Sequence, residues 1–453
     1  MIFSSITFLY VFLPLCLLTY YMSWTKAKNV ILLIFSLLFY SFGEPRLLYV
    51  IVGCIVFVYC AALLLEKCDS KLFYVILIIL SISPLIYFKY TNFFITNINN
   101  LFNLNLNLLK ITLPLGISFY TFQMISYLID VKRKEIPAEK NLIKLALYVC
   151  FFPQLIAGPI VTYKSIRSQI NQRELTIDRI NSGILLFITG LGKKVLIANQ
   201  LGELCALYTH TNATIAFTWI WAIAFTLQIY FDFSGYSTMA IGLGKLFGFE
   251  LPINFNYPLI SKSIKEFWTR WHITLSGFFK NYVYIPLGGS RCSKSRNIIN
   301  LFVVWFLTGF WHGANWQFIL WGLLFFICLC VEKYIFKFTI NNFVAHIGTL
   351  LIIIVSFLIF GSNNLNDMIF KLKHLFIGRF IDTNTVFIIK NYCIIIILAI
   401  IGSTPLLKYL YNKLIKNKKW TFILEAIFIA GILLLSTAYL IDGSFNPFLY
   451  FRF

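Results

Sequence analysis

A succession of long apolar runs separated by short loops is the feature that most constrains this chain. Hydrophobic residues make up 59% of its 453 residues, charged residues only 12%, and the mean hydropathy is +0.81. A soluble globular chain carries about 25% charged residues, so the composition predicts a polytopic membrane protein. A helix of about 20 apolar residues crosses a bilayer, and the runs predict an all-α fold with about ten to twelve transmembrane helices. No long polar linker interrupts the runs, so we expect a single integral-membrane domain over residues 1–453.

The net charge of +21 does not indicate a nucleic-acid partner. The basic residues are spread through short loops and form no continuous basic face or arm. Lys and Arg in short loops keep those loops on the cytoplasmic side of a membrane, which predicts cytoplasmic positions for residues 132–134 and 408–419. An additional role in attracting an anionic cytosolic substrate, such as a coenzyme A thioester, stays open.

Several segments depart from a simple spanning helix. Residues 151–160 contain two prolines and a glycine and predict a broken or re-entrant helix, which the membrane tolerates only where protein or a cavity covers the backbone. We expect residues 92–110 to be external or interfacial, and 235–249 to be a half-inserted helix capped by Asp232. Residues 262–296 mix basic and aromatic side chains, which predicts an amphipathic helix in the cytoplasmic interface.

The sequence offers no pattern for a metal, a permanently bound cofactor or a hydrolase-type nucleophile. Its ten cysteines are scattered without a C-x-x-C pair, and no H-E-x-x-H or G-x-S-x-G occurs. The cysteines inside the apolar runs also lack charged neighbours that would lower a thiol pKa. The chain is therefore expected to deprotonate an incoming hydroxyl rather than form a covalent acyl intermediate of the hydrolase type.

Two of the five histidines, His272 and His312, lie forty positions apart in apolar surroundings, each directly after a tryptophan. An ionisable group at membrane depth is a functional-site hypothesis by default. Gly309 and Gly313 flank His312 and leave room for a ligand, although G-x-x-x-G is also a helix-packing motif in membranes. Packing does not explain a histidine between the glycines, so we favour a general base oriented by Asn315. A positioned imidazole typically contributes about 10²–10⁴-fold to a rate.

The interpretation of His272 stays open at this level. A helix over 264–280 would place it on an aromatic face, with a Glu266–Arg270 pair on a neighbouring face. An interfacial histidine with a buried body and a solvated tip fits this pattern as well as a functional one does. The face would be formed by Trp268, His272, Leu275, Ser276 and Phe279.

Nine motifs in this order resemble one family, the membrane-bound O-acyltransferases, in the branch of the alginate and peptidoglycan O-acetylation membrane subunits. One residue departs from the family's Phe-Trp-Arg-Arg-Trp-His element, because Thr269 stands where that element usually carries arginine. The motifs include Phe-Phe-Pro-Gln-Leu-Ile-Ala-Gly-Pro-Ile and Phe-Trp-Thr-Arg-Trp-His, and they occupy residues 2–9, 113–123, 151–160, 232–237, 254–258, 267–276, 284–291, 311–316 and 447–453.

The resemblance implies a ring of helices with a central funnel and a family-like core at about 110–340. It implies that His312 is essential at the constriction and that His272 lies on the cytosolic side. Acetyl-coenzyme A would be the acyl donor, and membrane lipid would surround the protein. An extracytoplasmic partner with a serine-esterase-like domain is also expected. Substrate-channel or orienting roles are expected for Trp311, Asn315, Trp268, Arg270 and Trp271.

The sequence therefore predicts a bacterial inner-membrane O-acetyltransferase that modifies a cell-envelope glycan, either peptidoglycan or an exopolysaccharide such as alginate. D-alanyl transfer to teichoic acid is the alternative within the same enzyme class. A transporter with structural histidines, or a scaffold that only recruits an acyltransferase, is the alternative from another class.

Overall fold

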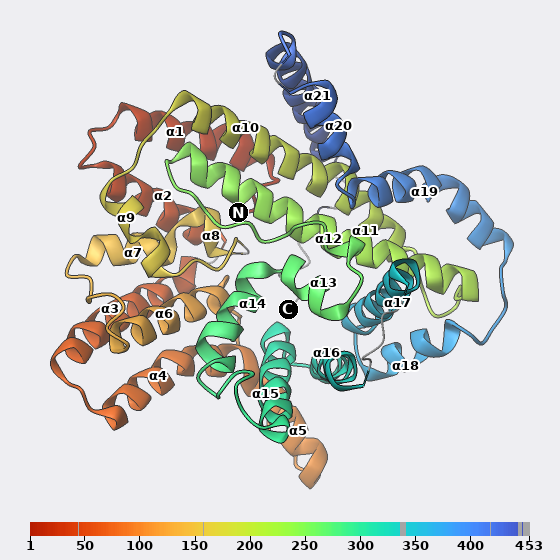
Figure 1. The fold of residues 1–453 in the computed structure, drawn as a ribbon, viewed down its shortest axis with the longest axis horizontal. Coiled ribbons are helices and arrows are strands. Elements are labelled where there is room, and N and C mark those ends of the chain that lie inside the picture. Colours follow the sequence, from red (N-terminus) through yellow and green to blue (C-terminus); the bar gives the residue numbers. More distant parts are fainter. Residues whose placement is uncertain (44, 157, 336–340, 417, 443–445, 447–453) are drawn as a thin grey trace. The chain divides into compact units, whose positions relative to one another are not determined.

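The computed structural model describes the whole chain except residues 44, 157, 336–340, 417, 443–445 and 447–453. Its described residues form helices and contain no strand, which confirms the all-α prediction (Figure 1). Within that part of the chain, eight helices are long and apolar enough to cross a membrane, and two shorter apolar helices precede them. The motif at 447–453 lies outside the described residues.

The chain divides into two compact units. The first comprises residues 1–184 and 240–252, and the second comprises 185–239 and 253–453. In the first unit α2 packs on α7, and both α3 and α4 pack on α6. Its helices are α1 (Leu13–Met22), α2 (Lys28–Ser41), α3 (Leu48–Lys67), α4 (Lys71–Leu85), α5 (Thr91–Phe102), α6 (Ile117–Lys132), α7 (Leu142–Cys150), α8 (Phe152–Leu155) and α9 (Tyr163–Asn171).

The second unit holds both candidate histidines. In it α16 packs between α15 and α17, α13 packs on α16, and α11 packs on α19. The helices α10 (Ile177–Gly192) and α12 (Ile215–Leu246) contribute to both units. The others are α11 (Asn199–Ala206), α13 (Ile264–Arg270), α14 (Ile273–Phe279), α15 (Lys294–His312), α16 (Trp316–Tyr334), α17 (Asn342–Phe360), α18 (Leu365–His374), α19 (Thr383–Gly402), α20 (Leu406–Leu414) and α21 (Thr421–Ile441).

The irregular segments agree with the sequence only in part. The break at 151–160 is present, since α7 ends at Cys150 and α8 covers Phe152–Leu155. The stretch 92–110, in contrast, is helical as far as Phe102, where it continues the helix that begins at Lys71. A helical backbone is compatible with an external or interfacial position, so that position stays a prediction.

The expected half-inserted helix at 235–249 is wrong, because α12 runs without interruption from Ile215 to Leu246. Asp232 therefore caps nothing. It lies mid-helix and forms a buried ion pair with Lys194, with 2.6 Å between Nζ and Oδ1. A buried charge requires such a counter-ion. Lys194 lies 38 residues before Asp232 in the sequence, so a local sequence pattern cannot show the pair.

The crossing of α15 and α16 depends on glycine. A Cβ atom on Gly309 would lie 2.4 Å from the Phe318 carbonyl oxygen, and one on Gly322 would lie 2.4 Å from the Trp305 carbonyl oxygen. At Gly313 a Cβ atom would lie 2.2 Å from the Phe318 ring. The space beside the glycines is thus filled by α16, which supports the helix-packing interpretation of Gly309 and leaves no room there for a ligand.

Replacing Gly322 by alanine should force α15 and α16 apart and lower stability by about 1–3 kcal/mol, the usual cost of overpacking. Thermal unfolding of the detergent-purified protein measures this. Gly348→Ala is the matched control, because a Cβ atom there meets open space. Equal unfolding midpoints for the two variants would contradict the packing account.

Candidate active site

His272 occupies a break between two short helices. α13 ends at Arg270, α14 begins at Ile273, and His272 has φ 44° and ψ 52°, in the left-handed region. A residue other than glycine rarely adopts this conformation, because the strained backbone costs about 1–3 kcal/mol of folding free energy. The predicted continuous helix over 264–280 is therefore wrong, because the reversal at His272 turns the ring away from the face that a straight helix would give it.

Asn254 fixes which nitrogen of His272 carries the proton. Its Oδ1 accepts hydrogen bonds from the Thr274 backbone N–H at 3.1 Å and from the Thr274 hydroxyl at 2.9 Å. The Nδ1 of His272 lies 3.2 Å from the same oxygen. A backbone N–H can only donate, so the amide oxygen is assigned, and Nδ1 of His272 must be protonated to donate to it. Its Nε2 therefore carries the lone pair.

The surroundings of His272 keep its ring neutral. The side chain is completely buried, and desolvation lowers the pKa of His272 from 6.5 to about 3. Phe233 contacts the ring at 4.6 Å between centroids. Among the described residues no group hydrogen-bonds to its Nε2. The site therefore presents one buried, unprotonated nitrogen that can accept a hydrogen bond.

His312 ends α15 inside a shell of aromatic rings. It is 4% exposed, and its ring centroid lies 4.9 Å from that of Trp321 and 5.3 Å from that of Phe360. Trp311 contacts both histidines, at 4.9 Å from His312 and 6.2 Å from His272. The structure thus joins the two histidines of the sequence prediction through one tryptophan.

The other predicted residues differ in their relation to this shell. Trp268 packs on Trp305 and Trp321 in the same aromatic cluster, and Trp271 packs nearby on Phe357. Both tryptophans thus belong to the aromatic surroundings of the histidines, and their substrate-channel or orienting roles stay predictions.

Arg270 and Asn315 lie outside the shell. Arg270 pairs with Glu266 and donates to the Asn256 carbonyl oxygen at 3.1 Å, so it anchors the loop that carries Asn254. Asn315 is exposed before α16, and its side chain makes no hydrogen bond to His312 among the described contacts. The orienting role predicted for Asn315 therefore has no contact to support it.

Sequence reasoning gave no role to Asn254, Trp321 or Phe360. Asn254 lies within a quoted motif, but its partner is 18 residues away, and only the folded chain shows that its oxygen selects a tautomer. Trp321 and Phe360 lie on α16 and α17 inside uniformly apolar runs, where the pattern gives no signal for a single ring.

A narrow cavity of about 150 Å³ approaches the shell along α14 and α15. Its lining includes Lys280 and Thr308, and Thr308 lies one helical turn before His312. Over the described residues, no cluster of His, Cys, Asp or Glu is arranged to hold a metal ion. The cavity is lined by Trp268, Leu275, Ser276, Phe279, Lys280, Tyr284, Leu301, Val304, Trp305 and Thr308.

Comparison with known proteins identifies the family of this chain. Residues 132–362 match the membrane-bound O-acyltransferase family. The chain belongs to this family. A probable alginate O-acetylase of Pseudomonas aeruginosa is 40% identical over 381 residues, which are 81% of this chain and 73% of the relative.

Two further relatives match this chain over different shares of its length. A peptidoglycan O-acetyltransferase of Helicobacter pylori is 37% identical over 417 residues, 82% of this chain and 79% of the relative. A teichoic acid D-alanyltransferase of Bacillus subtilis is 30% identical over 221 residues, 46% of this chain and 56% of the relative. The protein is accordingly an acyltransferase with several membrane spans, as the motifs predicted.

Burial of His272 should lower the stability of the folded acyltransferase in acid. Its folded pKa of about 3 lies below the ordinary 6.5, so the unfolded state binds more protons between these values. Stability is then lost as pH falls through that window, by at most about 1.4 kcal/mol per pH unit. Unfolding midpoints at about pH 7.5 and about pH 5 should differ less for His272→Gln than for the wild type. An unchanged difference would contradict the burial of a neutral ring.

Proposed function

We propose that this protein is a bacterial inner-membrane acetyltransferase. It would take an acetyl group from cytosolic acetyl-coenzyme A and pass it across the membrane for O-acetylation of a cell-envelope glycan, peptidoglycan or an exopolysaccharide such as alginate. The observation that carries the proposal is the His312 imidazole, enclosed by aromatic rings at the end of α15 in a family of O-acyltransferases.

In the proposed reaction His312 acts as general base. One ring nitrogen takes the proton of the acceptor hydroxyl while the oxygen attacks the thioester carbonyl. A carbon–oxygen bond forms, the carbon–sulfur bond breaks, and the departing thiolate takes the proton from the imidazolium. No covalent acyl-enzyme is needed, and the water-poor aromatic shell keeps the thioester from hydrolysis.

The cavity along α14 and α15 supports entry of the donor from the cytosolic side. Both Lys280 and Thr308 belong to its lining. The segment 262–296, which includes Lys280, carries seven basic residues. Such a surface suits the phosphates of coenzyme A, and a narrow apolar passage suits its acyl arm.

His272 would have a positioning role in this scheme. Its protonated Nδ1 is held by Asn254, and its ring touches Trp311, which also touches His312. It would accept a hydrogen bond at Nε2 from a substrate group on the cytosolic side of Trp311. With a pKa of about 3, it is too weak a base to replace His312 at neutral pH.

The alternatives are less well supported. The D-alanyltransferase relative covers 46% of the chain, against 81% for the alginate O-acetylase. A transporter or a pure scaffold leaves the aromatic enclosure of His312 without a purpose. A serine-esterase-like partner on the outer side would complete delivery to the glycan, as the family resemblance implies.

His312→Ala should reduce envelope O-acetyl groups by at least about 10²-fold, the usual contribution of a general base. Released acetate from purified envelope, measured in a strain that carries the variant as the only copy, provides the readout. His346→Ala is the matched control, since its ring bonds to the Ser261 carbonyl oxygen away from the shell. Wild-type acetylation by a correctly inserted His312→Ala protein would refute the proposal, and incorporation of labelled D-alanine would favour the rival reaction.

A further inference from the structure

A groove with a volume of about 490 Å³ lies between α3 and α4 in the first unit. Both helices contribute small residues to its lining, namely Gly53, Cys54, Ser81, Ser83 and Pro84. A Cβ atom on Gly53 would meet no neighbouring atom within 4 Å. Met124 belongs to the lining as well, and its helix α6 packs on both α3 and α4. The small side chains thus leave open a hollow between the two helices.

The wall of this groove is apolar. Its two serine hydroxyls are already used, because Ser81 donates to the Leu77 carbonyl oxygen at 2.8 Å and Ser83 donates to the Leu80 carbonyl oxygen at 2.9 Å. None of the described residues that line the groove is charged, and most of them are aliphatic or aromatic. A polar ligand would lose its hydration against such a wall without gaining hydrogen bonds. The wall therefore matches a hydrocarbon chain.

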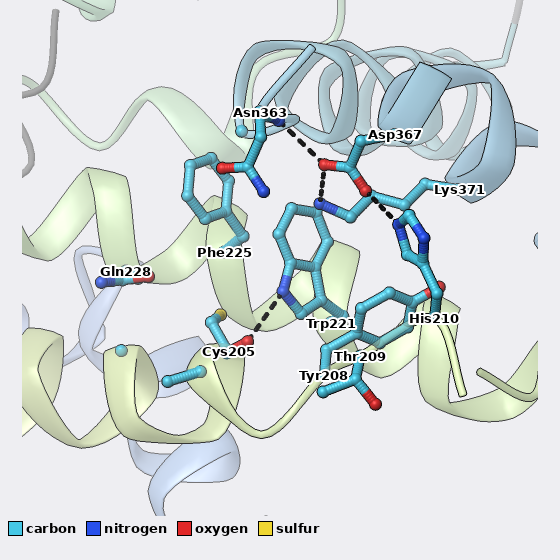
Figure 2. Close-up of a pocket in the computed structure, with 13 residues that line it drawn as sticks. Cys205, Tyr208, Thr209, His210, Trp221, Phe225, Gln228, Asn363, Asp367 and Lys371 are labelled. Carbon is cyan, nitrogen blue, oxygen red and sulfur yellow. Dashed lines mark hydrogen bonds and ion pairs between the residues drawn. The ribbon is translucent and has the colours of Figure 1, made fainter. Parts of the chain in front are cut away.

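A cavity of about 400 Å³ in the second unit has the opposite character (Figure 2). Its wall contains the Asp367 carboxylate, which accepts hydrogen bonds from Lys371 at 2.9 Å and from His210 at 2.8 Å. Of the two hollows, only the groove of the first unit is free of charged side chains among its described lining residues.

The groove opens to the lipid of the membrane. Its two walls belong to helices that are long and apolar enough to span a bilayer, Pro45–Lys67 and Lys71–Phe102, and Tyr49, Leu80 and Tyr87 are exposed along it. On α3 the lining extends from Tyr49 to Val58, which is about 14 Å at a rise of about 1.5 Å per residue. One leaflet contributes about half of the hydrocarbon core of about 30 Å. The groove is therefore about as long as an acyl chain in one leaflet is deep.

A positive charge lies at one end of the groove. Tyr49 also lines a shallow hollow that includes Pro45 and Arg46. Arg46 is exposed, and no ion pair joins it to another described residue. A guanidinium group matches phosphate oxygens in bidentate geometry, and tyrosine is enriched at the level of lipid headgroups. This end of the groove therefore matches the phosphate of a lipid headgroup.

The charge pattern assigns the Arg46 end to the outer leaflet. The turn that follows α3 is joined to the basic cluster at 132–134, because Lys132 Nζ lies 2.6 Å from Asp69 Oδ1. The positive-inside rule predicts a cytoplasmic position for this cluster. Since α3 spans the membrane, its other end, with Arg46, then lies on the outer side.

We propose that the groove binds one phospholipid of the outer leaflet. An acyl chain would lie between α3 and α4 against Gly53 and Met124, and the phosphate would bind to Arg46. The lipid would fill the hollow and stabilise the packing of both helices on α6. This site does not depend on the proposed acetyl transfer.

Native mass spectrometry of the full-length protein, purified in a mild detergent and mixed with phosphatidylglycerol, tests the acyl-chain site. The wild type should retain one phospholipid, and Gly53→Leu should lose it, because the leucine side chain occupies the hollow. Gly348→Leu is the matched control, since a Cβ atom there also meets open space on a spanning helix outside the groove. Phosphatidylglycerol should also raise the unfolding temperature of the wild type and of Gly348→Leu, but not that of Gly53→Leu. A wild type without bound phospholipid, or equal retention by Gly53→Leu, would overturn the site.

Arg46→Gln tests the headgroup contact separately. The wild type should retain phosphatidylglycerol in preference to a diacylglycerol with the same chains, because only the phospholipid carries a phosphate. Arg46→Gln should lose this preference, and Lys26→Gln should keep it, since Lys26 is exposed and belongs to neither lining. Equal retention of the two lipids by the wild type, or an unchanged preference in Arg46→Gln, would refute the phosphate contact.

Discussion

The close crossing of α15 and α16 is the constraint on which the site depends. Gly309 and Gly322 allow the two backbones to approach to a distance that a single methyl group on either would prevent. Only at that approach can Trp321 of α16 pack 4.9 Å from the ring of His312. Small residues therefore shape the surroundings of His312 indirectly, since in lipid they are what allows helices to pack closely.

Desolvation then gives the two histidines different chemistry. His272 is wholly buried, and Asn254 holds it in the neutral tautomer with its proton on Nδ1, so that its Nε2 can accept a hydrogen bond. His312 ends its helix inside the aromatic shell, and the cavity along α14 and α15 includes Thr308, one helical turn before it.

The sequence predicted much of this because burial and charge leave local patterns. Apolar runs indicated the helices, Pro153 and Pro159 indicated the break near α8, and the two tryptophan–histidine pairs pointed to two buried rings that both contact Trp311. The pattern could not show the reversal at His272, because a straight helix and a broken one share the same spacing. It also could not show Asn254 as the partner of His272, since that contact depends on how distant segments pack.

The most direct test of the account is a cryo-electron microscopy structure with a non-hydrolysable ketone analogue of acetyl-coenzyme A. The account predicts that the analogue passes between α14 and α15 beside Lys280 and Thr308, with its carbonyl group next to the His312 ring. An analogue bound with its carbonyl group far from the His312 ring would contradict it.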